Sequence, residues 1–111
     1  MSDEKYKITV SGKTISAIRT SPDGDARFTF VYAPGAGSNI NDPFGDYLSS
    51  RLPAAGASLV RFQFPYMEAG RGRPDYQPVL LKTVRSAVTA AAVLSDGLPL
   101  FAGGKSMGGR M

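Results

Sequence analysis

The sequence predicts an α/β fold in which a mostly parallel sheet is covered by helices. Two observations carry this prediction: strand-like and helix-like segments alternate along the chain, and a short, wholly apolar segment follows the last helix. With 42% hydrophobic and 20% charged residues, the composition is that of a folded protein. At 111 residues, the chain is expected to form a single domain, residues 1–111.

The first 33 residues predict a hairpin followed by a buried strand. Tyr6–Val10 alternates apolar and polar residues, residues 11–13 supply a turn, and Ile15–Ile18 forms the second arm. A turn signal at residues 21–25 separates this hairpin from Phe28–Ala33, which is rich in β-branched and aromatic residues. We expect Phe28–Ala33 to be the first strand inside the sheet.

The middle of the chain predicts a helix, a strand and an irregular segment. Asp42 suits a helix N-cap and Pro43 the first helical position, and Pro53 and Gly56 are expected to close this helix. The next strand is expected at 57–64. Residues 65–74 show no period of their own, which predicts an exposed loop over one end of the sheet.

A second helix and a last strand complete the pattern. From residue 76 to 95 the spacing is helical, with an apolar face formed by Leu80, Leu81, Val84, Val88, Ala91 and Ala92. Asp96 and Gly97 are expected to end this helix. The wholly apolar segment Leu98–Ala102 is typical of a strand with both faces buried in a parallel sheet.

The amino-acid counts exclude several kinds of chemistry. The chain has no cysteine and no histidine, so these residues alone cannot form a disulfide, a Cys or His metal site, or a Ser-His-Asp triad. Its net charge of +4 is scattered, which argues against nucleic acid as a partner. No leader-like segment or apolar run of membrane-spanning length is evident, so we expect a cytoplasmic protein without a membrane partner.

The strongest chemical motif follows the last predicted strand. Gly104, Ser106 and Gly108 match G-x-S-x-G, in which a serine sits on a sharp strand-to-helix turn. Strand and helix pass so closely there that both glycine positions must lack side chains. The backbone N–H of Met107 is then a candidate donor to an oxyanion. A second donor is expected from the small-residue loop 34–37.

Two other interpretations of this motif compete with a catalytic serine. A phosphate-binding P-loop needs G-x-x-x-x-G-K-[ST], but Pro99 stands at the first glycine position. Gly12-Lys13-Thr14 fails in the same way, because Lys7 stands there. The other interpretation is a glycine-rich turn with an incidental serine, which the preceding strand and the earlier glycine loop disfavour.

Several segments together resemble one family. They are Phe30–Gly37, Asp42–Phe44, Val60–Met67, Arg73–Asp75 and the block Gly103–Arg110. This set is similar to the α/β-hydrolase-like family of dienelactone-hydrolase type that includes the testis-expressed and NSL-complex-subunit proteins. The resemblance implies an α/β-hydrolase fold, with Ser106 as nucleophile and Ala36, Gly37 and Met107 at the oxyanion positions. Relatives often carry histidine where this chain has Pro34.

The same resemblance implies a partial catalytic domain. In this fold the acid and the histidine follow the serine, but only five residues follow Ser106 here. The chain is therefore expected to be the N-terminal half of a hydrolase domain, either a fragment or a short product without triad chemistry. The expected function is hydrolysis of a carboxylic ester or related acyl compound through Ser106 in a complete protein. The alternative is a non-catalytic interaction or scaffold protein, so enzyme activity is left open.

The partners expected from the sequence are few. A small-molecule ester or acyl substrate is expected, and nothing implies a metal or an organic cofactor. The last strand, if unpaired on one side, predicts self-association through an exposed sheet edge. Four arginines are candidates for lining an anion-binding mouth, although arginines near loops are more often solvated or paired; they are Arg61, Arg71, Arg73 and Arg110.

Overall fold

The fold is built on one five-stranded mixed sheet. A computed structural model describes residues 1–71, 73–105 and 107–111. Within it the strand order is β1-β2-β4-β3-β5. The strands are β1 (Ser2–Val10), β2 (Lys13–Ser21), β3 (Phe28–Ala33), β4 (Ala57–Phe62) and β5 (Leu100–Gly104). β1, β2 and β4 pair antiparallel in turn, whereas β4, β3 and β5 are parallel. The predicted α/β sheet is therefore confirmed.

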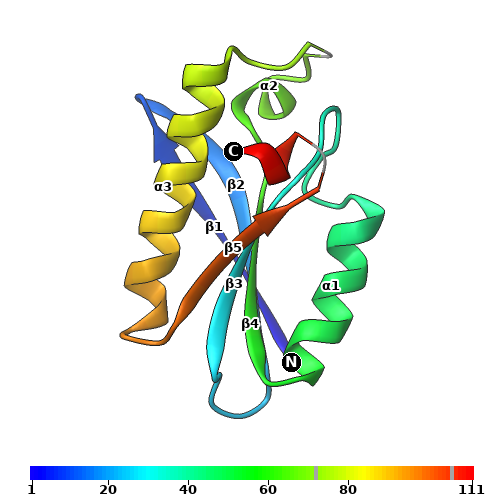
Figure 1. Ribbon diagram of the computed structural model, residues 1–111, viewed down its shortest axis with the longest axis vertical. Coiled ribbons are helices and arrows are strands. Elements are labelled where there is room, and N and C mark those ends of the chain that lie inside the picture. Colours follow the sequence, from blue (N-terminus) through cyan, green and yellow to red (C-terminus); the bar gives the residue numbers. More distant parts are fainter. Residues whose placement is uncertain (72, 106) are drawn as a thin grey trace.

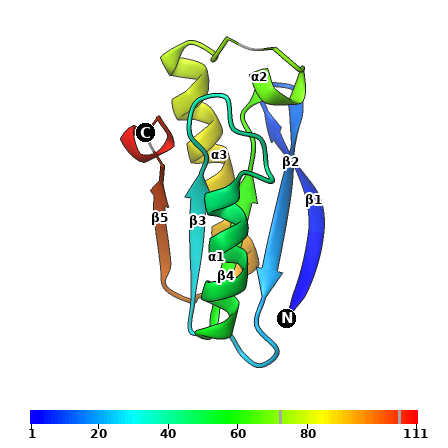
Figure 2. The ribbon, with the colours of Figure 1, turned by 90° about the vertical axis from the view of Figure 1, so that its right-hand side faces the viewer.

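Helices cover both faces of this sheet. α1 (Pro43–Ala54) joins β3 to β4, and α3 (Gln77–Ser95) leads from the end of β4 toward β5. Figures 1 and 2 show α1 and α3 on opposite sides of the sheet. Two shorter elements, α2 (Pro65–Glu68) and η1 (Gly108–Arg110), lie at the end of the sheet where β3, β4 and β5 finish.

The face under α3 holds the apolar core. Ile8, Val10, Ile15 and Ala17 come from the hairpin, while Val31, Val60 and Phe62 come from the parallel strands, and all are at most 4% exposed. α3 packs Leu80, Ala87 and Ala91 onto them. Burial of this apolar surface is the main stabilising contribution to the fold.

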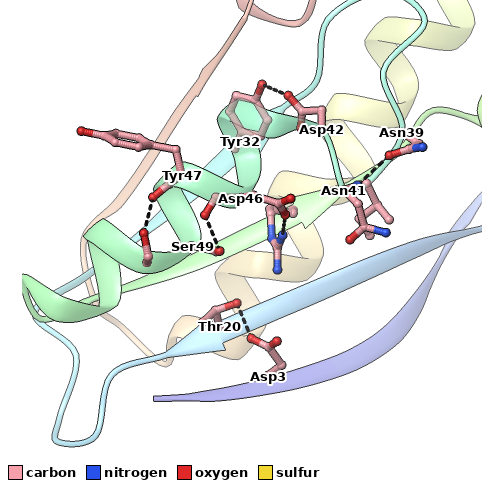
Figure 3. Close-up of polar contacts among 12 residues, drawn as sticks. Asp3, Thr20, Tyr32, Asn39, Asn41, Asp42, Asp46, Tyr47 and Ser49 are labelled. Atoms are coloured by element: carbon pink, nitrogen blue, oxygen red, sulfur yellow. Dashed lines mark hydrogen bonds and ion pairs between the residues drawn. The ribbon is translucent and has the colours of Figure 1, made fainter.

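The face under α1 is more polar (Figure 3). Tyr32 donates a hydrogen bond to Asp42 at 2.9 Å, and burial together with this carboxylate raises the pKa of the tyrosine hydroxyl. Arg61, buried on β4, forms an ion pair with Asp46 of α1 at 3.1 Å. These contacts join α1 to β3 and β4 through side chains. Gly45 lets the helix lie close to the strands there, because a Cβ at this position would be 3.3 Å from the Tyr32 ring and 3.5 Å from Arg61 Cδ.

Most predicted boundaries hold, but four details differ. Asp42 is the N-cap residue of α1, yet its carboxylate accepts from Tyr32 and caps no helical N–H. Pro53 lies inside α1, and Gly56, with φ of +88°, follows it. Residues 65–68 form the turn of helix α2 instead of an irregular loop. On α3, Ala92 is exposed and Thr83 is buried, because the Thr83 hydroxyl donates to the Val79 carbonyl within the helix.

The last strand is also less buried than predicted. β5 begins at Leu100 instead of Leu98, and Phe101 is 54% exposed. β5 pairs only with β3 in the sheet that the structure describes, so it lies at an edge, where one face and one side remain open. A wholly apolar sequence cannot by itself distinguish an edge strand from a central strand.

α3 is both long and apolar. Its 19 residues are long and apolar enough to cross a membrane by length and hydropathy alone. In the structure this helix packs along the sheet, with Leu80, Ala87 and Ala91 in the core. The core helix of a globular domain passes the same test, so α3 gives only weak evidence of a membrane span.

Glu68 ties α2 to the hairpin. The carboxylate accepts a hydrogen bond from the backbone N–H of Ser16, just beyond the last pair of β2 with β4, Ala17 with Phe62. Burial acts to raise the pKa of Glu68, but hydrogen bonds from Ser16 and Gln63 and the charge of Lys7 outweigh it and hold the pKa below its ordinary value of 4.5. The ionised form is thus favoured in the folded state.

Replacing Glu68 by glutamine is expected to make the free energy of unfolding depend less on pH in the acid range. Because folding lowers this pKa, the ionised carboxylate stabilises the protein fully above about pH 4.5, and this contribution is lost as the pH falls through the folded-state pKa. The free-energy difference between wild type and Glu68→Gln in urea unfolding should therefore be larger at pH 7 than at pH 3.

The matched control is Glu4→Gln, which removes a carboxylate paired with Arg19 at the surface. An exposed pair contributes about 0–1 kcal/mol, so the control should show a smaller pH effect. An equal pH effect in both variants would contradict the role given to Glu68.

Candidate active site

The carboxyl ends of β3 and β5 meet at one edge of the sheet. These neighbouring strands run parallel, with Ala33 opposite Gly104 at their ends. The backbone N–H of Lys105 then donates to the carbonyl of Ala33 at 3.2 Å, and the N–H of Gly108 donates to the carbonyl of Lys105 at 3.0 Å. The edge beyond the carboxyl ends of strands is where α/β proteins place ligands.

The described residues at the end of β5 and after it, 104–105 and 107–109, include glycines packed backbone against backbone. We call this segment the glycine turn. A Cβ at Gly104 would lie 2.6 Å from the carbonyl carbon of Gly108 and 2.7 Å from the carbonyl oxygen of Ala33. A Cβ at Gly108 would overlap the carbonyl oxygens of Ala33 and Pro34. Both positions are therefore restricted to glycine, which agrees with the close approach expected from the sequence.

The segment after β3, residues 34–39, lies against this turn, and we call it the β3 loop. Pro34 and Gly35 are buried, while Ala36 and Gly37 are exposed. Gly37 has φ of +74°, a conformation that favours glycine. Its N–H donates to the hydroxyl of Tyr66 at 2.8 Å. The two oxyanion candidates in this loop thus differ, because the N–H of Gly37 already has an acceptor within the protein.

Tyr66 joins the β3 loop to the segment after α2. Its side chain is fully buried, and its backbone N–H donates to Asp75 at 2.9 Å. The carbonyl of Tyr66 accepts from the N–H of Arg71 at 2.9 Å, and the Arg71 guanidinium pairs with Asp75 at 2.8 Å. The contact between Tyr66 and Gly37 could not be predicted from local pattern, because 29 residues separate them.

The structure does not place every predicted site residue. Ser106 lies outside the described residues, as does the side chain of Arg110. Met107, which follows Ser106, is 8% exposed and packs into the apolar core. The predicted roles of Ser106, Ala36, Gly37 and Met107 therefore stay predictions, whereas the two loops expected to carry them are in contact.

Of the three described arginines that were predicted to line an anion-binding mouth, only Arg71 and Arg73 lie in the same region. Arg61 is buried and paired with Asp46 on the α1 face, while Arg71 pairs with Asp75 beyond α2. Arg73 is exposed in the same segment as Arg71. In the part of the chain that the structure describes, no three acidic residues come together in a geometry able to hold a metal ion.

A small cavity lies on the α3 side of the glycine turn. Its volume is about 230 Å³, and it is lined by apolar and glycine residues, among them Val31, Phe62, Val84 and Gly108. The described side chains on its walls carry no charge, so this part of the cavity suits an apolar group.

Comparison with known proteins agrees with this geometry. The family model described as alpha/beta hydrolase domain matches residues 26–111, so the chain belongs to the α/β-hydrolase family. Comparison with curated proteins gives no match.

Solved structures support the same fold. An α/β serine hydrolase homologue from Coxiella burnetii has a TM-score of 0.81 at 20% identity, covering 97% of this chain and 54% of its own. A lidless α/β serine hydrolase from Xanthomonas campestris scores 0.82 at 15% identity, with coverages of 97% and 52%. Dienelactone hydrolase from Anabaena variabilis scores 0.77 at 18% identity, with coverages of 97% and 53%. The chain thus spans about half the length of these hydrolases.

Substitution of Gly108 by alanine should destabilise the protein by about 3 kcal/mol, the range of severe overpacking. The new methyl group would meet two backbone carbonyl oxygens, which cannot move without separating β3 from β5. Urea unfolding measures the change.

Gly24→Ala is the matched control for this substitution, because a Cβ at Gly24 meets no atom within 4 Å. Its effect should stay within about 0.5 kcal/mol. If Gly108→Ala is as harmless as Gly24→Ala, the close packing of the glycine turn against the β3 loop is wrong.

Tyr66→Phe should lower stability by about 1 kcal/mol and loosen the β3 loop. The substitution removes the acceptor of the Gly37 N–H and keeps the buried ring. Faster amide exchange at Gly37, measured by NMR, would report the loosening directly.

Tyr6→Phe provides the comparison for this change. The buried hydroxyl of Tyr6 has no hydrogen-bond partner among the described residues, so its removal should be neutral or stabilising. Equal losses in the two variants would show that the contact between Tyr66 and Gly37 contributes nothing specific.

Proposed function

We propose that this chain carries the nucleophile and the oxyanion donors of a serine hydrolase acting on a small carboxylic ester or related acyl compound. Ser106 is the nucleophile of the proposal. We base the proposal on the backbone contact between the glycine turn and the β3 loop. This contact brings the segment that carries Ser106 next to the segment that carries Ala36. The hydrolase relatives of similar fold support it.

In this proposal the chemistry is acyl transfer. The Ser106 hydroxyl oxygen attacks the ester carbonyl, its proton passes to a base, and the carbonyl oxygen becomes an oxyanion. The N–H groups of Met107 and Ala36 then donate to that oxyanion. The C–O bond to the alcohol then breaks, the alcohol leaves with the proton from the base, and water hydrolyses the acyl-serine to release the acid and free Ser106. We assign Ala36 ahead of Gly37, because the N–H of Gly37 donates to Tyr66 and Ala36 is exposed at the same edge.

The base and the acid are supplied from outside these 111 residues in the proposal. The sequence contains no histidine, and its nine acidic residues all precede Ser106, whereas the fold places the acid and then the histidine after the serine. The serine should therefore be a weak nucleophile in the 111-residue chain, with only oxyanion stabilisation left to assist a reaction.

A non-catalytic interaction protein is the competing function. The open side of β5 favours it, since Phe101 is 54% exposed there and Phe28 meets it edge to face at 5.5 Å between ring centroids. An unpaired apolar edge of this kind is suited to pairing with another chain, including a second copy.

Labelling with a fluorophosphonate probe tests the proposal. The 111-residue protein should show no stoichiometric labelling, because the base that activates Ser106 is absent. A polypeptide that continues in frame past Met111 through an acid and a histidine should be labelled, and Ser106→Ala should abolish the labelling. Mass spectrometry locates the modified residue.

Two outcomes would contradict the proposal. Labelling of the 111-residue chain that disappears in Ser106→Ala would show that the serine needs no added base. A longer form that stays unlabelled and inert toward activated esters would favour the interaction protein.

A further inference from the structure

A second cavity lies apart from the glycine turn, at the same end of the sheet. Its volume is about 580 Å³. Three segments form it: the turn between β1 and β2, the chain between α2 and α3, and the first turns of α3. These segments converge near the top of Figure 1. Ala36, Gly37 and Met107 are not among the described residues that line it.

Basic side chains dominate the polar part of this cavity, which we call the basic pocket. Lys13, Arg71, Arg73 and Lys82 line it, and the one carboxylate is Asp75. The pocket thus carries a formal excess of three positive charges out of the +4 of the whole chain. Cations gathered around one cavity repel one another, and an anion in the cavity relieves that repulsion.

Asp75 neutralises only one of these cations. One carboxylate oxygen accepts from Arg71 at 2.8 Å, and the other accepts from the backbone N–H of Tyr66 at 2.9 Å. Among the described residues, Lys13, Arg73 and Lys82 have no ion pair. These three side chains therefore remain available to a ligand.

Two residues of the basic pocket, Arg71 and Asp75, are held to the folded core. The N–H of Arg71 donates to the carbonyl of Tyr66 at 2.9 Å, and the Tyr66 side chain is fully buried. Asp75 is held at the same residue through the Tyr66 N–H, and its side chain is 7% exposed. This part of the wall is therefore in place without a ligand, and only the exposed side chains of Lys13, Arg73 and Lys82 lose conformational entropy on binding.

The remaining walls are apolar. Val10 and Val79 face the cavity together with prolines 65, 74 and 78, and Tyr76 stands 86% exposed at its margin. α3 begins here without an acidic residue in its first turn, so the partial positive charge of the helix end adds to the field of the side chains. The combination suits a ligand with an anionic head and an apolar body.

We propose that the basic pocket binds a small organic anion in which a phosphate or carboxylate is joined to an apolar group. The head group contacts Lys13, Arg73 and Lys82, and the apolar body lies against the valines and prolines. This site is separate from the proposed Ser106 chemistry, and its occupancy is measurable whether or not the protein hydrolyses esters.

Isothermal titration calorimetry of the 111-residue protein tests the proposal with three probes. Phenyl phosphate carries both features, inorganic phosphate only the anion, and benzyl alcohol only the apolar group. Phenyl phosphate should bind saturably at one site, inorganic phosphate more weakly, and benzyl alcohol negligibly. The affinity for phenyl phosphate should fall as salt is raised, because ions screen exposed charges beyond about 10 Å at 0.1 M.

The Arg73→Gln/Lys82→Gln double variant should bind phenyl phosphate about tenfold more weakly or worse. Its matched control is Lys5→Gln/Arg51→Gln, which removes one lysine and one arginine exposed on other surfaces. This control should bind within about twofold of wild type.

Three results would overturn the proposal. The first is the absence of saturable binding of phenyl phosphate. The second is equal binding of benzyl alcohol, which would leave the cations without a role. The third is an equal loss of affinity in both double variants, which would mean that overall charge, and not this pocket, attracts the anion.

Discussion

The contact between two stretches of backbone at the ends of β3 and β5 is the constraint on which the candidate site depends. Gly104 and Gly108 approach the carbonyl groups of Ala33 and Pro34 more closely than any side chain would allow. This approach aligns the β3 loop with the turn after β5, and the hydrogen bond from Lys105 to Ala33 continues the strand pairing into that turn. Positions that are separated by some 70 residues in the chain thereby share one edge of the sheet.

The two faces of the sheet contribute to this arrangement in different ways. The α3 face is an apolar core, which supplies most of the burial and continues to Met107 beneath the turn. The α1 face relies on specific polar contacts, above all those of Tyr32 with Asp42 and Arg61 with Asp46. A buried arginine whose partner is lost leaves an uncompensated charge, so the α1 face tolerates fewer substitutions than its modest apolar area suggests.

Much of the fold could be predicted from local pattern. The hairpin turn has positive φ at both Ser11 and Gly12, and Asp96 and Gly97 end α3 with positive φ, as their residue types indicated. α2 starts at Pro65, and proline is common at the first position of a helix. The sequence did not predict this helix, because it is too short to show a periodic apolar pattern. The exposure of Phe101 depends on the order of the strands in the sheet, and the local sequence of β5 does not indicate that order.

Part of the candidate site could also be predicted from local pattern. The glycines at 104 and 108 were identified because their spacing reflects a steric requirement within one turn. The contacts of Tyr66 with Gly37 and with Asp75 join separate segments, and the side-chain types alone do not indicate them. The basic pocket illustrates this limit most clearly, because Lys13 and Lys82 come together only when the hairpin lies beside the start of α3.

The pairing of β5 with β3 also has a consequence for the order of folding. The β1–β2 hairpin closes over two residues, whereas the pairing of Thr29 with Leu100 closes a loop of about 70 residues. Loop-closure entropy opposes distant contacts more than local ones, so we expect the hairpin and the helices to form before β5 joins the sheet. The close packing of Gly104 and Gly108 against the β3 loop depends on the pairing of β5 with β3, so we expect it to form late.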